Sequence, residues 1–227
     1  MPTLFETSDG SITLCDPASG QAMHAKEGAY SETKYIYGEA FLRIVQQELP
    51  ASVMVVGLGL GYIELMVIAY SLKEKTKSLQ ITSFENNDEY RLAFLAWLRN
   101  EESKFNPIYE KICQRLADDL QVSGIKEAAQ NLYLKERWQI HPDLDLQLVS
   151  LKHSLICYDP YSSSANPTLW QEKWLTEFMS HSCSQTCVFT TYASNGNLKR
   201  ALHKCGFTLL EKPGFGMKRE STLATRS

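Results

Sequence analysis

The chain has 227 residues, of which 44% are hydrophobic, and its formal net charge at pH 7 is −3. This size and apolar fraction favour one α/β domain with additions, and the charge gives no global sign of nucleic-acid binding. No run of about 18 apolar residues is present, and the N-terminus lacks a basic start and an apolar segment. We therefore expect a cytoplasmic protein without a membrane span or export signal.

The N-terminal 40 residues are predicted to be an extension. They contain turn signals at Asp9-Gly10 and Ser19-Gly20 and an amphipathic stretch after Tyr30. We expect residues 41–227 to form the main domain, in which residues 100–135 are a helical insertion.

The main domain alternates between strand-like and helix-like segments. Strands are predicted at residues 52–57, 79–85, 154–159 and 185–192, with less regular candidates at 132–140 and 143–151. Period alone does not separate strand from helix at 143–151. Helices are predicted at 62–73, 87–100, 166–180 and 197–205, with Asn87 or Asp88 as the N-cap of the second. Segments 206–212 and 216–224 resemble a closing hairpin.

This alternation predicts a doubly wound, Rossmann-like parallel sheet covered by helices on both faces, with an antiparallel C-terminal edge. In such sheets, ligands lie at the carboxyl ends of the strands, near the point where the strand order reverses. The functional residues should therefore follow the predicted strands.

A glycine turn, Gly57-Leu-Gly59-Leu-Gly61, follows the first strand of the main domain and opens a helix. Glycines allow a tight turn and a close approach to a ligand, and Glu85, after the next strand, can accept hydrogen bonds from ribose hydroxyls. A dinucleotide fingerprint would need its third glycine where Tyr62 stands. The GxGxG spacing instead favours S-adenosylmethionine over NAD, although such glycines can also serve only close helix–strand packing.

The stretch "CYDPYSSSANPTLW" (157–170) ends another predicted strand with Asp159. A carboxylate at the edge of a core is costly unless its charge is used. Locally, a turn or helix-capping aspartate and a functional one fit equally well.

Six cysteines are scattered without a CxxC pair, which favours reduced thiols. We expect no metal site, because the histidines are scattered too. The chain ends in a basic segment: from Leu198 to Ser227, seven basic residues stand against two acids. This segment either contacts a polyanion or is a solvated surface.

Three stretches together resemble tRNA wobble-uridine methyltransferases of the MnmC/MnmD type. They are "TSDGSITL…GQAMHAKEGAYSETKYIY", "YDPYSSSANPTLW" and "SNGNLKRALHKCGFTLLEKPGFGMKRE". With the glycine turn and "SFE", the resemblance covers most of the chain outside 100–135. Within the second stretch, Tyr161 replaces the family's usual phenylalanine and Ser163 its usual proline.

The resemblance implies methyl transfer from S-adenosylmethionine to the exocyclic amine of 5-aminomethyl-(2-thio)uridine in tRNA. Asp159 would then be the catalytic acid–base residue. The residues that it assigns to the cofactor are Gly57, Gly59, Gly61, Glu85, Glu32 and, if its loop is shifted by one residue, Asp143. The residues that it assigns to substrate or tRNA are Tyr161, Lys199, Arg200, Phe215, Lys218 and Arg219.

For several of these residues a purely structural role stays open as an alternative. Glu32, with Tyr30 and Tyr35, either covers the cofactor and shapes the base pocket or belongs to an amphipathic packing surface. An aromatic such as Tyr161 either packs in the core or stacks on a flipped-out base. Alternative functions are a methyltransferase or aminopropyltransferase for a small amine, and a catalytically silent tRNA-binding protein. No FAD-binding module follows, so we expect any deacetic step to belong to another protein.

Overall fold

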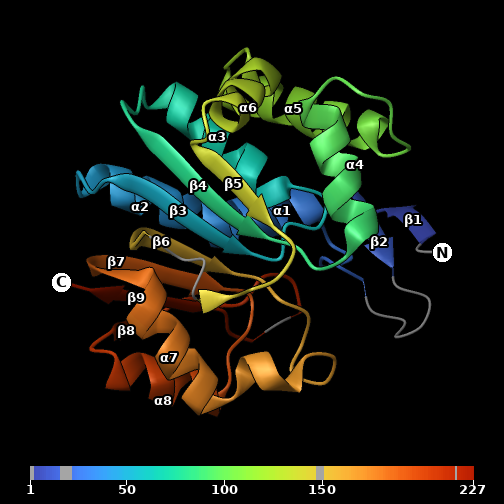
Figure 1. Ribbon diagram of the computed structural model, residues 1–227. Helices are drawn as coiled ribbons and strands as arrows, with labels where there is room; N and C mark the ends of the chain where they lie inside the picture. Colours follow the sequence, from blue (N-terminus) through green and yellow to red (C-terminus); the bar gives the residue numbers. More distant parts are fainter. Residues whose placement is uncertain (1–2, 16–21, 147–150, 218) are drawn as a thin grey trace.

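The computed structural model describes residues 3–15, 22–146, 151–217 and 219–227. Its centre is a seven-stranded sheet in the order β5-β4-β3-β6-β7-β9-β8 (Figure 1). The strands are β3 (Ala51–Val56), β4 (Leu79–Phe84), β5 (Trp138–His141), β6 (His153–Tyr158), β7 (Cys183–Thr191), β8 (Thr208–Leu210) and β9 (Thr222–Arg226). The first five pair in parallel, and β9 pairs antiparallel to both β7 and β8. The predicted fold class and the antiparallel C-terminal edge are confirmed.

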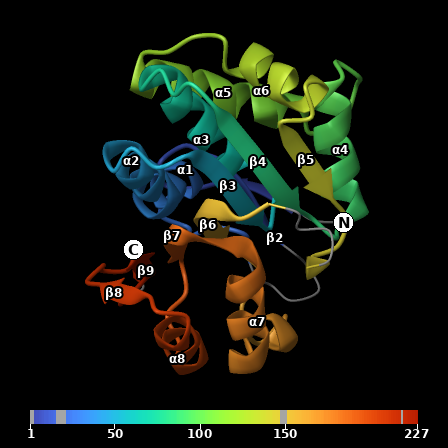
Figure 2. The same ribbon diagram turned by 60° about the vertical axis from the view of Figure 1, so that its left-hand side comes forward.

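Helices cover both faces of this sheet, and β3 shows why. All six of its residues are buried, since Val53 and Val55 pack in one core cluster while Met54 and Val56 pack in the other. Two helices lie on the second face, α7 (Glu172–Ser182) and α8 (Gly196–Lys204) (Figure 2). The first face carries α1 (Ala29–Thr33), α2 (Glu39–Gln46), α3 (Tyr62–Lys73), α4 (Asp88–Leu98), α5 (Asn106–Leu120) and α6 (Ile125–Leu134).

The strand order reverses between β3 and β6. From β3 the chain continues to β4 and β5 on one side, and from β6 it continues to β7 on the other. Gly57 follows β3 and Asp159 follows β6, and the two backbones touch: a Cβ on Gly57 would lie 2.5 Å from the Asp159 carbonyl oxygen. The glycine turn and the aspartate thus meet at the switch point of the sheet, where doubly wound folds bind ligands.

The N-terminal segment adds a small antiparallel sheet of β1 (Thr3–Glu6) and β2 (Ile12–Cys15). In the turn between them, the Asp9 carboxylate accepts hydrogen bonds from the backbone N–H and hydroxyl groups of Ser11 and Ser31. Burial acts to raise the pKa of Asp9, but these bonds outweigh it and hold the pKa at about 2. Asp9 therefore ties the hairpin to the first turn of α1.

A buried carboxyl group links three elements of the first core cluster. Trp138 Nε1 donates to Ser83 Oγ at 3.1 Å, and Ser83 Oγ donates to Glu64 Oε1 at 2.8 Å. Within the described part of the chain, Glu64 Oε2 has no hydrogen-bond partner. Burial raises the pKa of Glu64 to about 8, so the folded protein holds a proton there that the unfolded chain loses at ordinary carboxyl pH.

Glu64 should therefore make the protein less stable as pH rises. From pH 4.5, the ordinary value for this group, to about pH 8, its contribution to the free energy of unfolding falls by up to roughly 1.4 kcal/mol per pH unit. Glu64→Gln removes this titration, so the variant should lose less melting temperature than the wild type between the two ends of that range. If the melting temperatures of the two proteins fell equally over this pH range, the assignment of the titration to Glu64 would be wrong.

Three expectations about the elements are corrected. Residues 132–140 are not one strand, because α6 runs to Leu134 and β5 begins at Trp138. Within 166–180, a 3₁₀ helix (Pro167–Trp170) precedes α7. β9 begins only at Thr222, later than the predicted second strand of the hairpin. Part of 143–151, and the Ser19-Gly20 turn, lie outside the described residues.

Candidate active site

A cavity of about 730 Å³ opens at the switch point of the sheet. Its walls come from the loops after β3, β4, β5 and β6 and from Tyr192 just beyond β7. The N-terminal segment adds residues 22–26, the end of α1 (Glu32 and Thr33) and Tyr37. This volume suits a drug-sized ligand. Most of the residues predicted to hold a cofactor line it, namely Gly57, Gly59, Glu85, Glu32 and Asp143, and Asp159 lines it as well.

The glycine turn has the backbone conformation that requires glycine. The φ angles of Gly57, Gly59 and Gly61 are 95°, 53° and 73°. Gly61 is the N-cap of α3, and a Cβ there would lie 2.3 Å from the Phe94 ring. Gly61 itself thus serves helix packing, while Gly57 and Gly59 of the same turn line the cavity.

Glu85 is fixed against this turn. Its Oε2 accepts from Gly59 N at 2.8 Å and its Oε1 accepts from Asn87 N at 2.8 Å. Burial raises the pKa of Glu85, and the two backbone bonds oppose that rise. A carboxylate has about four acceptor sites, so two oriented oxygens still have capacity for ligand hydroxyls.

Asp159 does not cap a helix. The nearby 3₁₀ helix has no side-chain cap, and Asp159 Oδ1 accepts a 2.6 Å hydrogen bond from the hydroxyl of Tyr37. Its backbone N–H is paired with Val56 O at 2.8 Å, which continues the β3–β6 ladder to the residue that lines the cavity. The half-buried carboxylate is thus held at the cavity wall.

A second carboxylate lies near Asp159. Glu32, only 4% exposed, accepts from Ala25 N at 2.6 Å and lines the cavity. Burial raises the pKa of both Tyr37 and Tyr192, and the negative charges of Asp159 and Glu32 raise both further. Because the charges of Asp159 and Glu32 affect the same two tyrosine hydroxyls, both carboxylates lie in one region of the cavity. This region therefore favours cations.

Tyr30 and Tyr35 do not line the cavity, whereas Tyr37 does. The Tyr30 hydroxyl donates to Asp119 Oδ2 on α5 at 2.6 Å, and Tyr35 donates to Pro213 O at 3.1 Å. These two therefore tie the N-terminal segment to α5 and to the β8–β9 loop.

The serine-rich loop forms the wall next to Asp159. Tyr161 lines the cavity, and its carbonyl accepts from Trp170 Nε1 at 2.8 Å. Trp170 is 2% exposed and packs in the core, whereas Tyr192 lines the cavity and donates to Pro160 O at 2.9 Å. Asp143 lines the cavity from an exposed position, beside Leu144.

Among the basic residues predicted to contact tRNA, Lys199, Arg200 and Arg219 lie outside the cavity lining. Lys199 pairs with Glu220 at 2.7 Å and Arg200 with Glu172 at 2.6 Å, so acids already balance both. Phe215 packs near Tyr35, at 6.2 Å between ring centroids. Arg219 is exposed, and Lys218 lies outside the described residues. The tRNA-binding assignments stay predictions.

The described ranges contain no cluster of three or more His, Cys, Asp or Glu residues that could hold a metal ion, and no helix in them is long and apolar enough to cross a membrane. Cys113, Cys157, Cys183, Cys187 and Cys205 are free thiols.

Sequence reasoning missed Tyr37, and for Tyr192, as for Tyr161, it left open core packing or stacking on a base. The pattern "YIY" (Tyr35 to Tyr37) is evident in the sequence. It does not show which of the two tyrosine rings packs in the core and which lies at the surface. That difference depends on contacts over more than a hundred residues.

Residues 102–227 match a family described as S-adenosyl-L-methionine-dependent methyltransferases, and the chain belongs to this family. Its cofactor is therefore S-adenosylmethionine, as the glycine spacing predicted. The match includes two of the three stretches that carry the resemblance stated from the sequence.

The relatives confirm that resemblance. The chain is 22% identical over 206 residues to the tRNA 5-methylaminomethyl-2-thiouridine biosynthesis bifunctional protein MnmC of Campylobacter hominis, covering 84% of this chain and 28% of that protein. Over 65 residues it is 35% identical to the MnmC protein of Hahella chejuensis, covering 29% of this chain and 10% of that protein. The chain thus spans less than a third of the length of these curated relatives.

Solved structures share the fold. MnmC2 from Aquifex aeolicus superposes with a TM-score of 0.68 at 21% identity, covering 99% of this chain and 70% of that one. Spermidine synthase from Thermotoga maritima gives 0.54 at 13% identity, covering 99% and 68%.

Proposed function

We propose that this methyltransferase transfers a methyl group to the exocyclic amine of 5-aminomethyl-(2-thio)uridine at the wobble position of tRNA. The similarity to MnmC proteins supports the substrate. The observation that carries the proposal is the position of Asp159, which touches the glycine turn at the switch point and lines a cavity shared with Glu32.

The residues of the cavity fit S-adenosylmethionine. Glu85 would accept from ribose hydroxyls and the turn Gly57–Gly61 would approach the methionine portion, with Glu32 and Asp143 as further polar contacts. When bound, S-adenosylmethionine supplies an electrophilic methyl group on a positively charged sulfonium. An acidic cavity stabilises that charge, which repays part of the cost of holding half-buried carboxylates there.

Asp159 would prepare the nucleophile. An alkylammonium is mostly protonated near neutral pH and has no lone pair for attack. The Asp159 carboxylate would take the proton, directly or through one water, and hold the resulting amine in line by a hydrogen bond. General base action of this kind contributes about 10²–10⁴-fold to a rate.

A small amine is the second candidate substrate, for either methyl or aminopropyl transfer. The acidic cavity favours it as much as it favours an aminomethyl nucleoside. The ion pairs of Lys199 and Arg200 also leave less free positive charge for a phosphate backbone than the sequence suggested.

The two candidates separate in one experiment. In one reaction, the purified protein is incubated with S-adenosylmethionine and tRNA from a strain lacking the gene. In a parallel reaction, the tRNA is replaced by spermidine and putrescine. Mass spectrometry of digested nucleosides should show the 5-aminomethyl nucleoside converted to its methylamino form. If the free amines were methylated and the tRNA were not, the second proposal would replace the first.

A further inference from the structure

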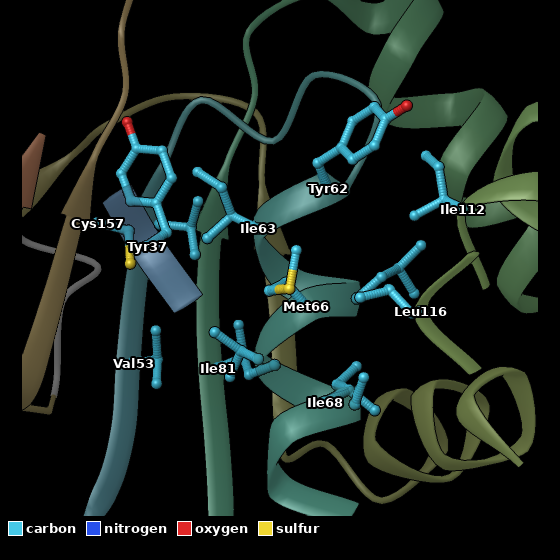
Figure 3. Close-up of a cluster of buried hydrophobic side chains, with 14 of the residues drawn as sticks. Tyr37, Val53, Tyr62, Ile63, Met66, Ile68, Ile81, Ile112, Leu116 and Cys157 are labelled. Carbon is cyan, nitrogen blue, oxygen red and sulfur yellow. The ribbon is translucent and has the colours of Figure 1, made fainter. Parts of the chain in front are cut away.

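The hydroxyl of Tyr37 donates a hydrogen bond to the Asp159 carboxylate. Tyr37 is 2% exposed, and its oxygen lies 2.6 Å from Asp159 Oδ1. The ring belongs to the first core cluster, which also contains Ile63 and Cys157. Figure 3 shows the hydroxyl pointing away from the apolar side chains of that cluster. Its ring thus serves the core while its oxygen reaches the cavity wall.

The backbone around Tyr37 is also fixed. Residues Lys34–Gly38 form a π-helical turn, a conformation often found at functional sites. The buried hydroxyl of Thr190 on β7 donates to the Ile36 carbonyl at 3.0 Å. Because Thr190 is paired with Cys157 on β6, this bond anchors the turn to the same sheet edge that carries Asp159.

Helix packing holds the turn from its other side. A Cβ on Gly38 would lie 2.8 Å from the Tyr70 ring of α3, so the two helices approach closely there. A side chain held by its ring, its neighbouring carbonyl and its helix contact has little freedom to move away from Asp159.

The Tyr37 hydroxyl stays protonated and therefore acts as the donor toward Asp159. Burial, reinforced by the charge of Asp159, raises the pKa of Tyr37 well above its ordinary value. The hydroxyl therefore keeps its proton throughout the neutral range and does not remove a proton from the substrate. A hydrogen bond from a neutral donor stabilises the charged form of a carboxylate and fixes its plane.

We propose that Tyr37 is a positioning residue that orients the Asp159 carboxylate toward the reacting amine and favours its charged form. The inference rests on the proposed role of Asp159 as proton acceptor. It extends that role to a residue of the N-terminal segment, so this segment takes part in the chemistry as well as in packing.

Tyr37→Phe tests the inference, with Tyr158→Phe as the matched control. Tyr158 stands next to Asp159 and is also buried, but its hydroxyl donates to the Leu169 carbonyl at 2.6 Å. For Tyr37→Phe we expect kcat to fall by about tenfold or more, while KM for S-adenosylmethionine stays near the wild-type value. The limb of the pH–rate profile that reports carboxylate protonation should move up by about one pH unit, since a charged hydrogen bond is worth roughly that much. Tyr158→Phe should change thermal stability without moving that limb.

A readout without turnover separates this inference from the proposed function. Carbon-13 NMR of aspartate-labelled protein, with Asp159→Asn to assign the signal, gives the titration midpoint of the Asp159 carboxyl. A midpoint about one pH unit higher in Tyr37→Phe supports the inference even if tRNA is not the substrate. An unmoved midpoint overturns it even if tRNA is methylated.

Discussion

Asp159→Asn is expected to slow methyl transfer by about 10²–10⁴-fold, the usual contribution of a general base. Asparagine has nearly the same shape and can still accept the Tyr37 hydrogen bond, but it cannot take a proton from an ammonium group. Affinity for S-adenosylmethionine should change little, because the turn and Glu85 remain intact. Single-turnover methylation and titration calorimetry measure the two quantities.

The control for this variant is Asp145→Asn, the same chemical change at an exposed residue outside the cavity lining. It should turn over like the wild type. If Asp159→Asn did the same, the carboxylate would have no part in the chemistry. A loss of cofactor binding equal to the loss of rate would instead assign Asp159 to the cofactor.

Gly57→Ala is expected to damage both cofactor binding and turnover. At φ 95° an alanine is strained, by about 1–2 kcal/mol or more, and its Cβ would meet the Asp159 carbonyl at 2.5 Å. Since that neighbour is backbone in a buried sheet, relief requires moving β3 or β6. We expect a lower melting temperature and at least about a tenfold weaker affinity for S-adenosylmethionine, which corresponds to about 1.4 kcal/mol.

Gly59→Ala gives the comparison. Its φ is also positive, 53°, but the nearest atom to its Cβ would be Met23 Sδ at 3.6 Å, an ordinary contact. The variant keeps the αL strain without the clash and should be clearly milder in both measurements. Equal defects in the two variants would mean that conformational strain alone, and not contact with the Asp159 strand, explains the Gly57 effect.

The sheet and its ligand edge followed from local sequence signals. Apolar strands, the glycine turn and the N-cap at Asn87 are encoded within a few residues, and Asn87 indeed accepts from Glu89 N at 2.9 Å. Once parallel strands were predicted, Gly57, Glu85 and Asp159 had to gather at one edge. That part of the candidate site needed no long-range information.

Other features depend on distant contacts and were not predictable. The Tyr37 bond to Asp159 spans 122 residues, and the pairs of Lys199 and Arg200 depend on how α8 packs against α7 and the β8–β9 loop. A basic cluster in the sequence gives charge but not partners. Lys212, counted among those charges, is 8% exposed and bonded to Glu39 and to the Tyr35 carbonyl.

The pH dependence of the Asp159→Asn defect tests the central claim most directly. The ratio of wild-type to variant kcat/KM for tRNA would be measured from about pH 7 to about pH 10, where solvent itself deprotonates an alkylammonium. If Asp159 removes the proton, the ratio should shrink steadily toward alkaline pH as free amine accumulates. A ratio that stays constant across this range would contradict the account, because Asp159 would then only shape the cavity.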